Sequence, residues 1–350
     1  MKAALIGPLQ SGKSTVVSAI SGKEGPAAGG THIEEAIANV PDERVEWLYD
    51  LYKPKKKVYA TLDCLDVPGF SFSDEHGRAN ARRLINQLRT AELLVVVVRA
   101  FDSAGKEREP SGDIVELKTE LLLSDLELVT TRIERLEKQL HKPGKTQGHD
   151  KAELELQLKL QEAIETEKPI RSVVQSEAEI DLIKSLGFMT LKPFIVVVNV
   201  SEGNIGREYD LSAAAGDAAT VSLCAKFEAE LRQLDEVSRA EFMADLGIES
   251  LAVNRFVKSC YDALGLISFL TVSSDEVRAW AIPRGTTAHD AAGKVHSDMK
   301  RGFIRAETMS FDDLREFGDE KAVKAAGRTR LEGKEYVVQD GDVIYFRFNV

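Results

Sequence analysis

The sequence predicts an α/β fold with a parallel-type central sheet, an inserted helical hairpin and a small β-grasp-like domain at its C-terminal end. An apolar strand, a glycine-rich turn and a helix follow one another from residue 2, which is the βα unit of a parallel sheet. A long polar insertion separates two apolar runs. Beyond Leu266 the pattern changes to short strands, which indicates a separate domain.

Length and composition restrict the class of protein. A chain of 350 residues can build two or three domains. Its 43% hydrophobic and 29% charged residues are ordinary for a folded protein and exclude disordered and membrane classes. The N-terminus enters a strand pattern directly, without a signal peptide. We therefore expect a cytoplasmic protein that has no membrane contact and is a monomer by default.

Charge and cysteine content exclude further classes. A net charge of −11 argues against broad non-specific binding to nucleic acid. The three cysteines are scattered and lack metal-ligand spacing, so they predict neither a disulfide framework nor a zinc site. We expect all three to be reduced thiols.

The polar insertion has the periodicity of two helices. Apolar residues recur at three- or four-residue steps from Leu117 to Leu140 and again from Leu154 to Ile164. Residues 141–148 between them are rich in turn formers, which favours an antiparallel helical hairpin. We predict a nucleotide-binding domain over 1–113 and 187–265, the hairpin over 114–186 and the last domain over 266–350.

Strands are expected where apolar or alternating runs occur. In the first domain these runs are residues 58–65, 93–98 and 194–198, and the last two are apolar throughout, as in strands covered on both faces. In the last domain we expect four strands, a tight turn at Asp340-Gly341 and one helix starting near Thr287. These four strands are residues 278–282, 303–309, 336–338 and 343–348.

Residues 7–14 read GPLQSGKS and are called here the phosphate loop. In such a loop, backbone N–H groups at a helix N-terminus bind phosphates, the lysine neutralises the β- and γ-phosphates, and the next hydroxyl binds Mg²⁺. The pattern arises by chance in about one chain in a hundred of this length. The nucleotide-binding residues predicted here are Gly7, Gln10, Ser11, Gly12, Lys13, Ser14 and Thr15.

The segment Asp66-Val67-Pro68-Gly69 ends the predicted strand over 58–65. A carboxylate at this position can reach Mg²⁺ through water, and the Gly69 amide can meet the γ-phosphate. The alternative is a plain turn that ends a strand. Its place downstream of the phosphate loop favours the functional interpretation.

The predicted base site is the segment Asn199-Val200-Ser201-Glu202, at the carboxyl end of a strand. A guanine-selective site would have Lys at position 200 and Asp at position 202. This chain has Val200 and Glu202 instead, and both differences favour adenine over guanine. A second loop, with Ser222, Cys224 and Ala225, is expected beside the base. The alternative is that Asn199 caps the strand end and that Glu202 is a solvent-exposed loop acid.

Four further segments, residues 224–228, 277–280, 301–307 and 338–343, resemble signature segments of the YchF-type Obg-like ATPases, of the translation-factor class of P-loop proteins. The resemblance extends over nearly the whole chain. It implies a G domain interrupted by a coiled-coil hairpin, then a TGS domain. It also implies preferential ATP binding and the ribosome, or its large subunit, as partner.

The resemblance also bears on the catalytic residues. Like family members, the chain has an apolar residue, Phe70, where classical GTPases hold a water-orienting Gln. His76, in the following loop, is the best local candidate to position water, beside Lys13 and Gly69 as predicted catalytic groups. Thr31 is implied as a Mg²⁺ ligand with Ser14 and Asp66. Gln10 replaces the family's Asn, which leaves K⁺ open as a further cation.

The sequence hypothesis is Mg²⁺-dependent ATP binding and slow hydrolysis that controls a switch. Two alternatives stay open: a nucleotide-gated scaffold with negligible hydrolysis, and a GTPase with a degenerate base loop. A basic run, Lys53 and Lys55 to Lys57, can contact RNA phosphates, but such runs are more often solvated loops.

Overall fold

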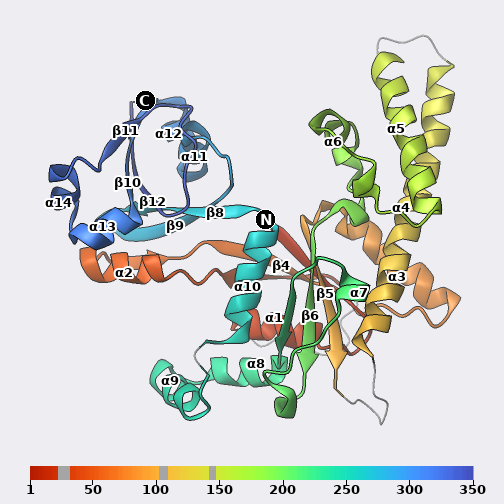
Figure 1. Cartoon of the computed structure of the whole chain (residues 1–350), viewed down its shortest axis with the longest axis horizontal. Coiled ribbons are helices and arrows are strands. Elements are labelled where there is room, and N and C mark those ends of the chain that lie inside the picture. The colour runs from red at the N-terminus through yellow and green to blue at the C-terminus, as the bar shows by residue number, and fades with distance from the viewer. Residues whose placement is uncertain (23–31, 102–108, 142–146, 249, 350) are drawn as a thin grey trace. The chain divides into compact units, whose positions relative to one another are not determined.

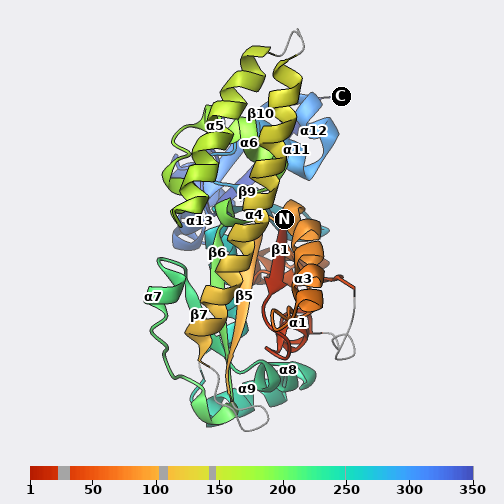
Figure 2. The same ribbon diagram turned by 90° about the vertical axis from the view of Figure 1, so that its right-hand side faces the viewer.

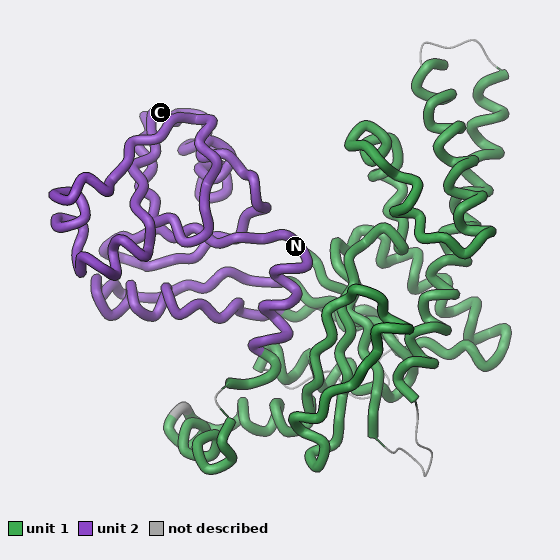
Figure 3. The backbone as a smooth tube through the Cα atoms, in the orientation of Figure 1, with its two compact units in different colours: residues 1–36, 63–253 green, residues 37–62, 254–350 purple. Residues whose placement is uncertain are grey.

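The computed structural model describes residues 1–22, 32–101, 109–141, 147–248 and 250–349 (Figure 1). It divides into two compact units (Figure 3): unit 1 holds residues 1–36 and 63–253, and unit 2 holds residues 37–62 and 254–350. The mixed α/β class, the helical insert and the separate C-terminal fold agree with the sequence prediction. The sequence did not indicate that residues 37–62 belong to the second unit.

A six-stranded sheet forms the centre of unit 1, in the order β2-β4-β1-β5-β6-β7. The strands from β4 to β7 in this order run parallel, so their carboxyl ends meet at one edge. Strands β5 and β6 are almost fully buried, as their apolar sequences predicted. The strand bounds are β1 Lys2–Ile6, β2 Glu34–Asn39, β4 Thr61–Asp66, β5 Leu93–Ala100, β6 Phe194–Val200 and β7 Thr220–Leu223.

Helices follow the strands of unit 1 in the alternation expected of a parallel sheet. Helix α1 begins at Lys13, within the phosphate loop, and α3 begins after the segment that follows Asp66. Strand β7 lies between α7 and α8. The helix bounds are α1 Lys13–Ser21, α3 Glu75–Gln87, α4 Pro110–Leu140, α5 Gln147–Glu165, α6 Glu177–Ile183, α7 Ser212–Ala215, α8 Ala225–Gln233 and α9 Glu236–Asp245.

Helices α4 and α5 form the predicted hairpin and lie side by side (Figures 1 and 2). Apolar residues of both helices, with those of the following turns, make a separate core that includes Val129, Leu156 and Leu160. Arg132 on α4 donates to both carboxylate oxygens of Glu153 on α5, at 2.6 and 2.8 Å. The buried seam and this pair fix the register of the hairpin.

The base of the hairpin is held by a buried carboxylate, Asp125 of α4. Its oxygens accept hydrogen bonds from Arg89 Nη1 at 3.0 Å, from the Met189 amide at 3.0 Å, and from the Thr190 amide and hydroxyl at 2.8 and 2.9 Å. Asp125 has no exposed surface. A buried charge with a full set of donors is stable only while every donor stays in place.

Unit 2 contains a second six-stranded sheet, ordered β11-β10-β12-β8-β9-β3, with a helix pair packed on one face. Residues 336–338, predicted as a strand, make only an isolated bridge between Val337 and Thr287. The bounds are β8 Leu266–Val272, β9 Glu276–Pro283, β10 Phe303–Ser310, β11 Arg330–Glu332, β12 Asp342–Phe348, α10 Ala252–Ala263 (which starts in unit 1), α11 Ala288–Val295, α12 Ser297–Arg301, α13 Phe311–Phe317 and α14 Glu320–Ala325.

The segment 37–62 is built into unit 2 through β3 (Lys56–Val58) and α2 (Glu43–Tyr52). Strand β3 pairs in parallel with β9, and Trp47 of α2 contacts Phe311 edge to face at 5.4 Å between ring centroids. The single strand predicted over 58–65 is therefore wrong: it is two strands, β3 and β4, in two different sheets. Alternation within one run carries no information about its pairing partners.

The basic run at residues 53–57 lies along this segment. Lys55 pairs with Asp275 at 2.7 Å, Lys56 with Glu276 at 3.1 Å and Lys57 with Glu46 at 2.6 Å. These contacts favour the interpretation as a solvated face, since the charges are already matched by carboxylates.

Candidate nucleotide-binding site

The phosphate loop connects β1 to α1 at the carboxyl edge of the sheet. Gly12 caps α1 with φ 89°, and a Cβ at this residue would lie 2.1 Å from Asn199 Nδ2. A side chain is therefore excluded for both conformational and steric reasons. The first amides of α1 are left free of intrahelical partners, as phosphate binding requires.

The side chain of Lys13 is folded back onto the phosphate loop. Its ammonium donates to the carbonyls of Gly7 and Pro8 at 3.1 and 2.8 Å and lies 3.3 Å from Ser11 Oγ. Burial lowers the pKa of Lys13 to about 8, and the nearby Asp66 carboxylate opposes this shift. A buried cation held mainly by carbonyl dipoles is ready to accept an anionic partner.

The two described residues of the predicted magnesium site come together. Burial raises the pKa of Asp66, while a hydrogen bond from Ser14 and the charge of Lys13 lower it. A hydroxyl and a carboxylate are hard oxygen donors, and Mg²⁺ typically takes one or two protein ligands besides phosphates and water. The pair therefore fits Mg²⁺. Thr31, the third predicted ligand, lies outside the described residues.

The segment after Asp66 is joined to the phosphate loop by backbone hydrogen bonds. The Leu9 amide donates to the Phe70 carbonyl, and the Phe70 amide donates to the Gly7 carbonyl, both at 3.0 Å. A Cβ on Gly69 would come within 2.8 Å of Leu9 Cα. Only glycine allows this approach, so the amide of Gly69 is held beside the phosphate loop.

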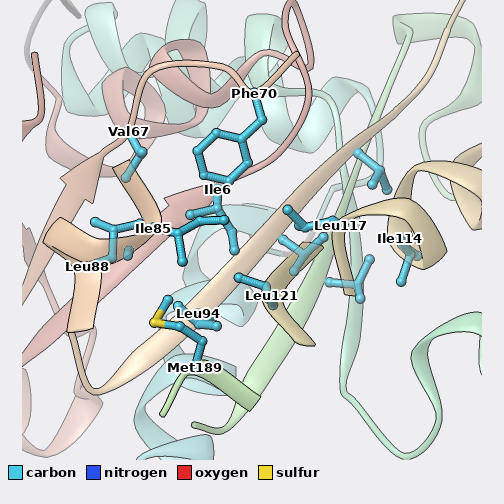
Figure 4. Packing of buried hydrophobic residues seen from close by; sticks show 14 of the residues in the cluster. Ile6, Val67, Phe70, Ile85, Leu88, Leu94, Ile114, Leu117, Leu121 and Met189 are labelled. Carbon is cyan, nitrogen blue, oxygen red and sulfur yellow. The ribbon is translucent and has the colours of Figure 1, made fainter. Parts of the chain in front are cut away.

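Phe70 points into the core of unit 1, where it packs with Ile6 and Ile85 (Figure 4). Its side chain is 2% exposed and cannot orient a water molecule beside the phosphates. His76 is the second residue of α3 and is exposed. Its role in positioning water stays a prediction.

A cavity of about 920 Å³ opens beside the phosphate loop at the ends of β5 and β6. A cavity of this size accommodates a nucleoside. Six predicted site residues line it, namely Gly12, Thr15, Asn199, Val200, Glu202 and Cys224. The sequence did not indicate the other lining residues that come from the loops after these strands, such as Phe101, Pro110, Arg207 and Tyr209.

Asn199 connects three parts of the site. Its Nδ2 donates to the Ser11 carbonyl at 3.0 Å, and its Oδ1 accepts from the Ala225 amide at 3.1 Å. It is 5% exposed. The structure thus places Asn199 as the residue that holds the phosphate loop against the second predicted base loop, with Ser222 on the adjacent strand β7.

Glu202 and Lys226 form an ion pair at 3.0 Å, and both side chains line the cavity. The two side chains are more than half exposed, so the pair contributes little to stability. Val200, by contrast, is 3% exposed and belongs to the core of unit 1, although it also lines the cavity. A buried apolar residue and an exposed carboxylate thus lie together at the predicted base site.

The fold and the site define a P-loop nucleotide triphosphatase with a G-domain-like sheet, a helical insert and a C-terminal β domain. The chain belongs to the YchF/Obg-like ATPase family. It is 38% identical to "Ribosome-binding ATPase YchF" of Bacillus subtilis (100% of both chains). It is 35% identical to "Obg-like ATPase 1" of Oryza sativa subsp. japonica (100% of this chain, 92% of that one).

Two further comparisons agree with this family. The family model YchF-GTPase_C, described as a protein of unknown function, matches residues 266–349. The structure described as that of the Schizosaccharomyces pombe YchF GTPase superposes with a TM-score of 0.86 at 30% identity, covering 99% of this chain and 97% of that one. Within the described ranges, no helix is both long enough and apolar enough to span a bilayer.

Proposed function

We propose that this protein binds ATP with Mg²⁺, hydrolyses it slowly, and uses the nucleotide state as a switch in its association with ribosomes. One observation carries the proposal: the phosphate loop, with its buried Lys13, opens into a cavity that is lined at the predicted base-contacting positions by Val200 and Glu202 rather than by Lys and Asp. Relatives named as ribosome-binding ATPases support both the nucleotide and the partner.

Hydrolysis in this site is chiefly a matter of positioning and charge. The amides at the start of α1 bind the phosphate oxygens, and the Lys13 ammonium moves from the loop carbonyls to the β- and γ-phosphates. Ser14, Asp66 and Thr31 would hold Mg²⁺, which neutralises charge on the phosphates. Water attacks the γ-phosphorus, the bond to the bridging oxygen breaks, and ADP and phosphate leave. The Gly69 amide would stabilise the γ-phosphate oxygens.

The path of the chain supports a switch. The chain leaves unit 1 after residue 36, close in sequence to the predicted ligand Thr31, and returns at residue 63, three residues before Asp66. The intervening segment is fixed in unit 2 by the pairing of β3 and by hydrogen bonds from Arg44 to Asp340 at 2.9 Å and from Tyr52 to Glu320 at 2.5 Å. The two predicted nucleotide-sensing segments therefore flank, along the chain, a segment that folds with unit 2, and this connectivity supports a switch that acts on unit 2.

Base selectivity tests the proposal directly. The wild-type protein is expected to bind a fluorescent ATP analogue at least about tenfold more tightly than the GTP analogue, and the Val200→Lys, Glu202→Asp double variant should reverse this preference. The physical reason is that an Asp carboxylate at position 202 accepts both N–H groups of guanine but faces a lone pair of adenine, whereas the wild-type Glu202 carboxylate is paired with Lys226 at 3.0 Å. Fluorescence titration in the presence of Mg²⁺ measures both affinities.

Phosphate release, followed in the same samples, separates the alternatives. Equal or GTP-favoured binding by the wild type would return the protein to the GTPases, as the name of the fission yeast relative suggests for that protein. ATP binding without phosphate release, alone or with ribosomes, would instead favour the scaffold.

The pH dependence of ATP affinity should report Lys13. Its pKa is about 8 in the free protein, and bound phosphates stabilise its charged form. Below pH 8 the lysine is already protonated, and above pH 8 binding must take up a proton. Affinity is therefore expected to fall above pH 8 by up to about tenfold per pH unit. Calorimetry in buffers of different ionisation enthalpy would measure the proton uptake, and its absence at pH 9 would contradict the assignment.

A further inference from the structure

Arg99, near the end of β5, is a buried cation beside the phosphate loop. It is 7% exposed, and its register partner on the neighbouring strand β6 is Asn199. Asn199 donates to the Ser11 carbonyl, and Arg99 Nη1 lies 3.5 Å from the carbonyl of the preceding residue, Gln10. Two adjacent strand-end side chains thus reach two consecutive carbonyls of the loop.

Within the described residues, the guanidinium of Arg99 has one acceptor, the Gln10 carbonyl, although it carries five N–H donors. Its buried Nε has no partner in the same ranges. By comparison, Arg89 in the same unit bonds to Asp125, Ser124 and the Gly187 carbonyl. Among the described residues Arg99 has no carboxylate partner, whereas Arg89 is paired with the buried Asp125. The contacts that stabilise Arg89 therefore have no counterpart at Arg99 within these ranges.

The residue that Arg99 contacts has an unusual backbone conformation. Gln10 has φ 61°, in the left-handed region that costs a residue with a side chain about 1–2 kcal/mol. Functional sites keep such conformations only where neighbouring groups hold them. At the next position along β6, Val200 is apolar, so it supplies no donor for the loop, and Arg99 supplies one from β5.

We propose that Arg99 is a positioning residue for nucleotide binding: it holds the Gln10 peptide in its left-handed conformation and so keeps the phosphate loop in its binding shape. The inference rests on the proposed nucleotide site. It assigns to Arg99 no contact with the substrate. Its action goes through the backbone of Gln10.

The Arg99→Met variant tests the proposal, because methionine fills similar space without donors or charge. Its affinity for the fluorescent ATP analogue with Mg²⁺ is expected to be about tenfold lower. The reason is that the left-handed backbone conformation of Gln10 is no longer stabilised by a hydrogen bond from Arg99. The urea midpoint of the nucleotide-free variant should be equal to or higher than that of the wild type, because the change removes a buried charge that has no carboxylate partner among the described residues. Arg89→Met is the matched control, and it should lower the midpoint while leaving ATP affinity unchanged.

A second background shows whether Arg99 acts through Gln10. Glycine adopts φ 61° without strain, so the same Arg99→Met change should cost less than about threefold in affinity in a Gln10→Gly background. A purely structural role for Arg99 would give the same loss in both backgrounds, or a lowered midpoint, and either result would overturn the inference. If the wild type binds ATP and Arg99→Met binds it equally well, the inference fails and the proposed function stands. Absence of wild-type binding would overturn both.

Discussion

The Lys13→Met variant is expected to lose at least about a hundredfold in ATP affinity, and its hydrolysis should fall below detection. Lys13 is the buried cation of the phosphate loop, and its three contacts, to Gly7, Pro8 and Ser11, are all within that loop. Bound phosphates replace these weak dipolar contacts with full charge pairing in a site of low dielectric. Titration with the fluorescent ATP analogue and phosphate-release assays measure the two effects.

Stability measurements separate this loss from unfolding. Burial lowers the pKa of Lys13 to about 8, so at neutral pH the charged form costs the folded state free energy relative to the unfolded chain. The Lys13→Met variant should therefore unfold at an equal or higher urea concentration in the absence of nucleotide. Lys118→Met is the control, because Lys118 is half-buried and also donates to a backbone carbonyl, that of Ala214, but lies outside the phosphate loop. If the Lys13→Met variant still binds ATP with an affinity within about threefold of the wild type, the phosphate loop does not bind the phosphates of ATP as proposed.

The sequence was most informative where the site is contiguous. The conformation of residues 7–14 could be predicted, because the glycines, the lysine and the start of the helix all lie within these eight residues. The carboxyl-edge position of Asn199 followed from the order of buried strands. Its contacts to Ser11 and Ala225 did not, since hydrogen bonds between distant residues leave no local pattern.

Two features could not be predicted, for physical reasons. Residues 56–58 pair with β9, more than 200 residues away in the chain, and strand alternation is the same whichever sheet receives the strand. Arg99 ends an apolar run and reads as an ordinary strand-end charge. Its role depends on its burial and on the φ of Gln10, neither of which is encoded in spacing.

The Asp125→Ala variant is expected to lose about 3–5 kcal/mol of unfolding free energy, the largest stability effect that we predict. The change leaves the Arg89 guanidinium half-buried without its carboxylate. It also leaves the amides of Met189 and Thr190 without acceptors. Each orphaned donor adds a desolvation cost, because the acceptor that it loses is fully buried. Urea denaturation, followed by circular dichroism, measures the loss.

Two companion variants make this result specific. In an Arg89→Met background the Asp125→Ala change should cost clearly less, because the buried cation that Asp125 neutralises is already gone. Asp181→Ala removes an exposed carboxylate paired with Lys184, and it should change stability by less than about 0.5 kcal/mol. If Asp125→Ala costs no more than Asp181→Ala, the base of the hairpin is not held by this carboxylate. In that case α4 would be held against unit 1 by the apolar contacts of Leu117 and Leu121 with its core, and not by the hydrogen bonds to Asp125.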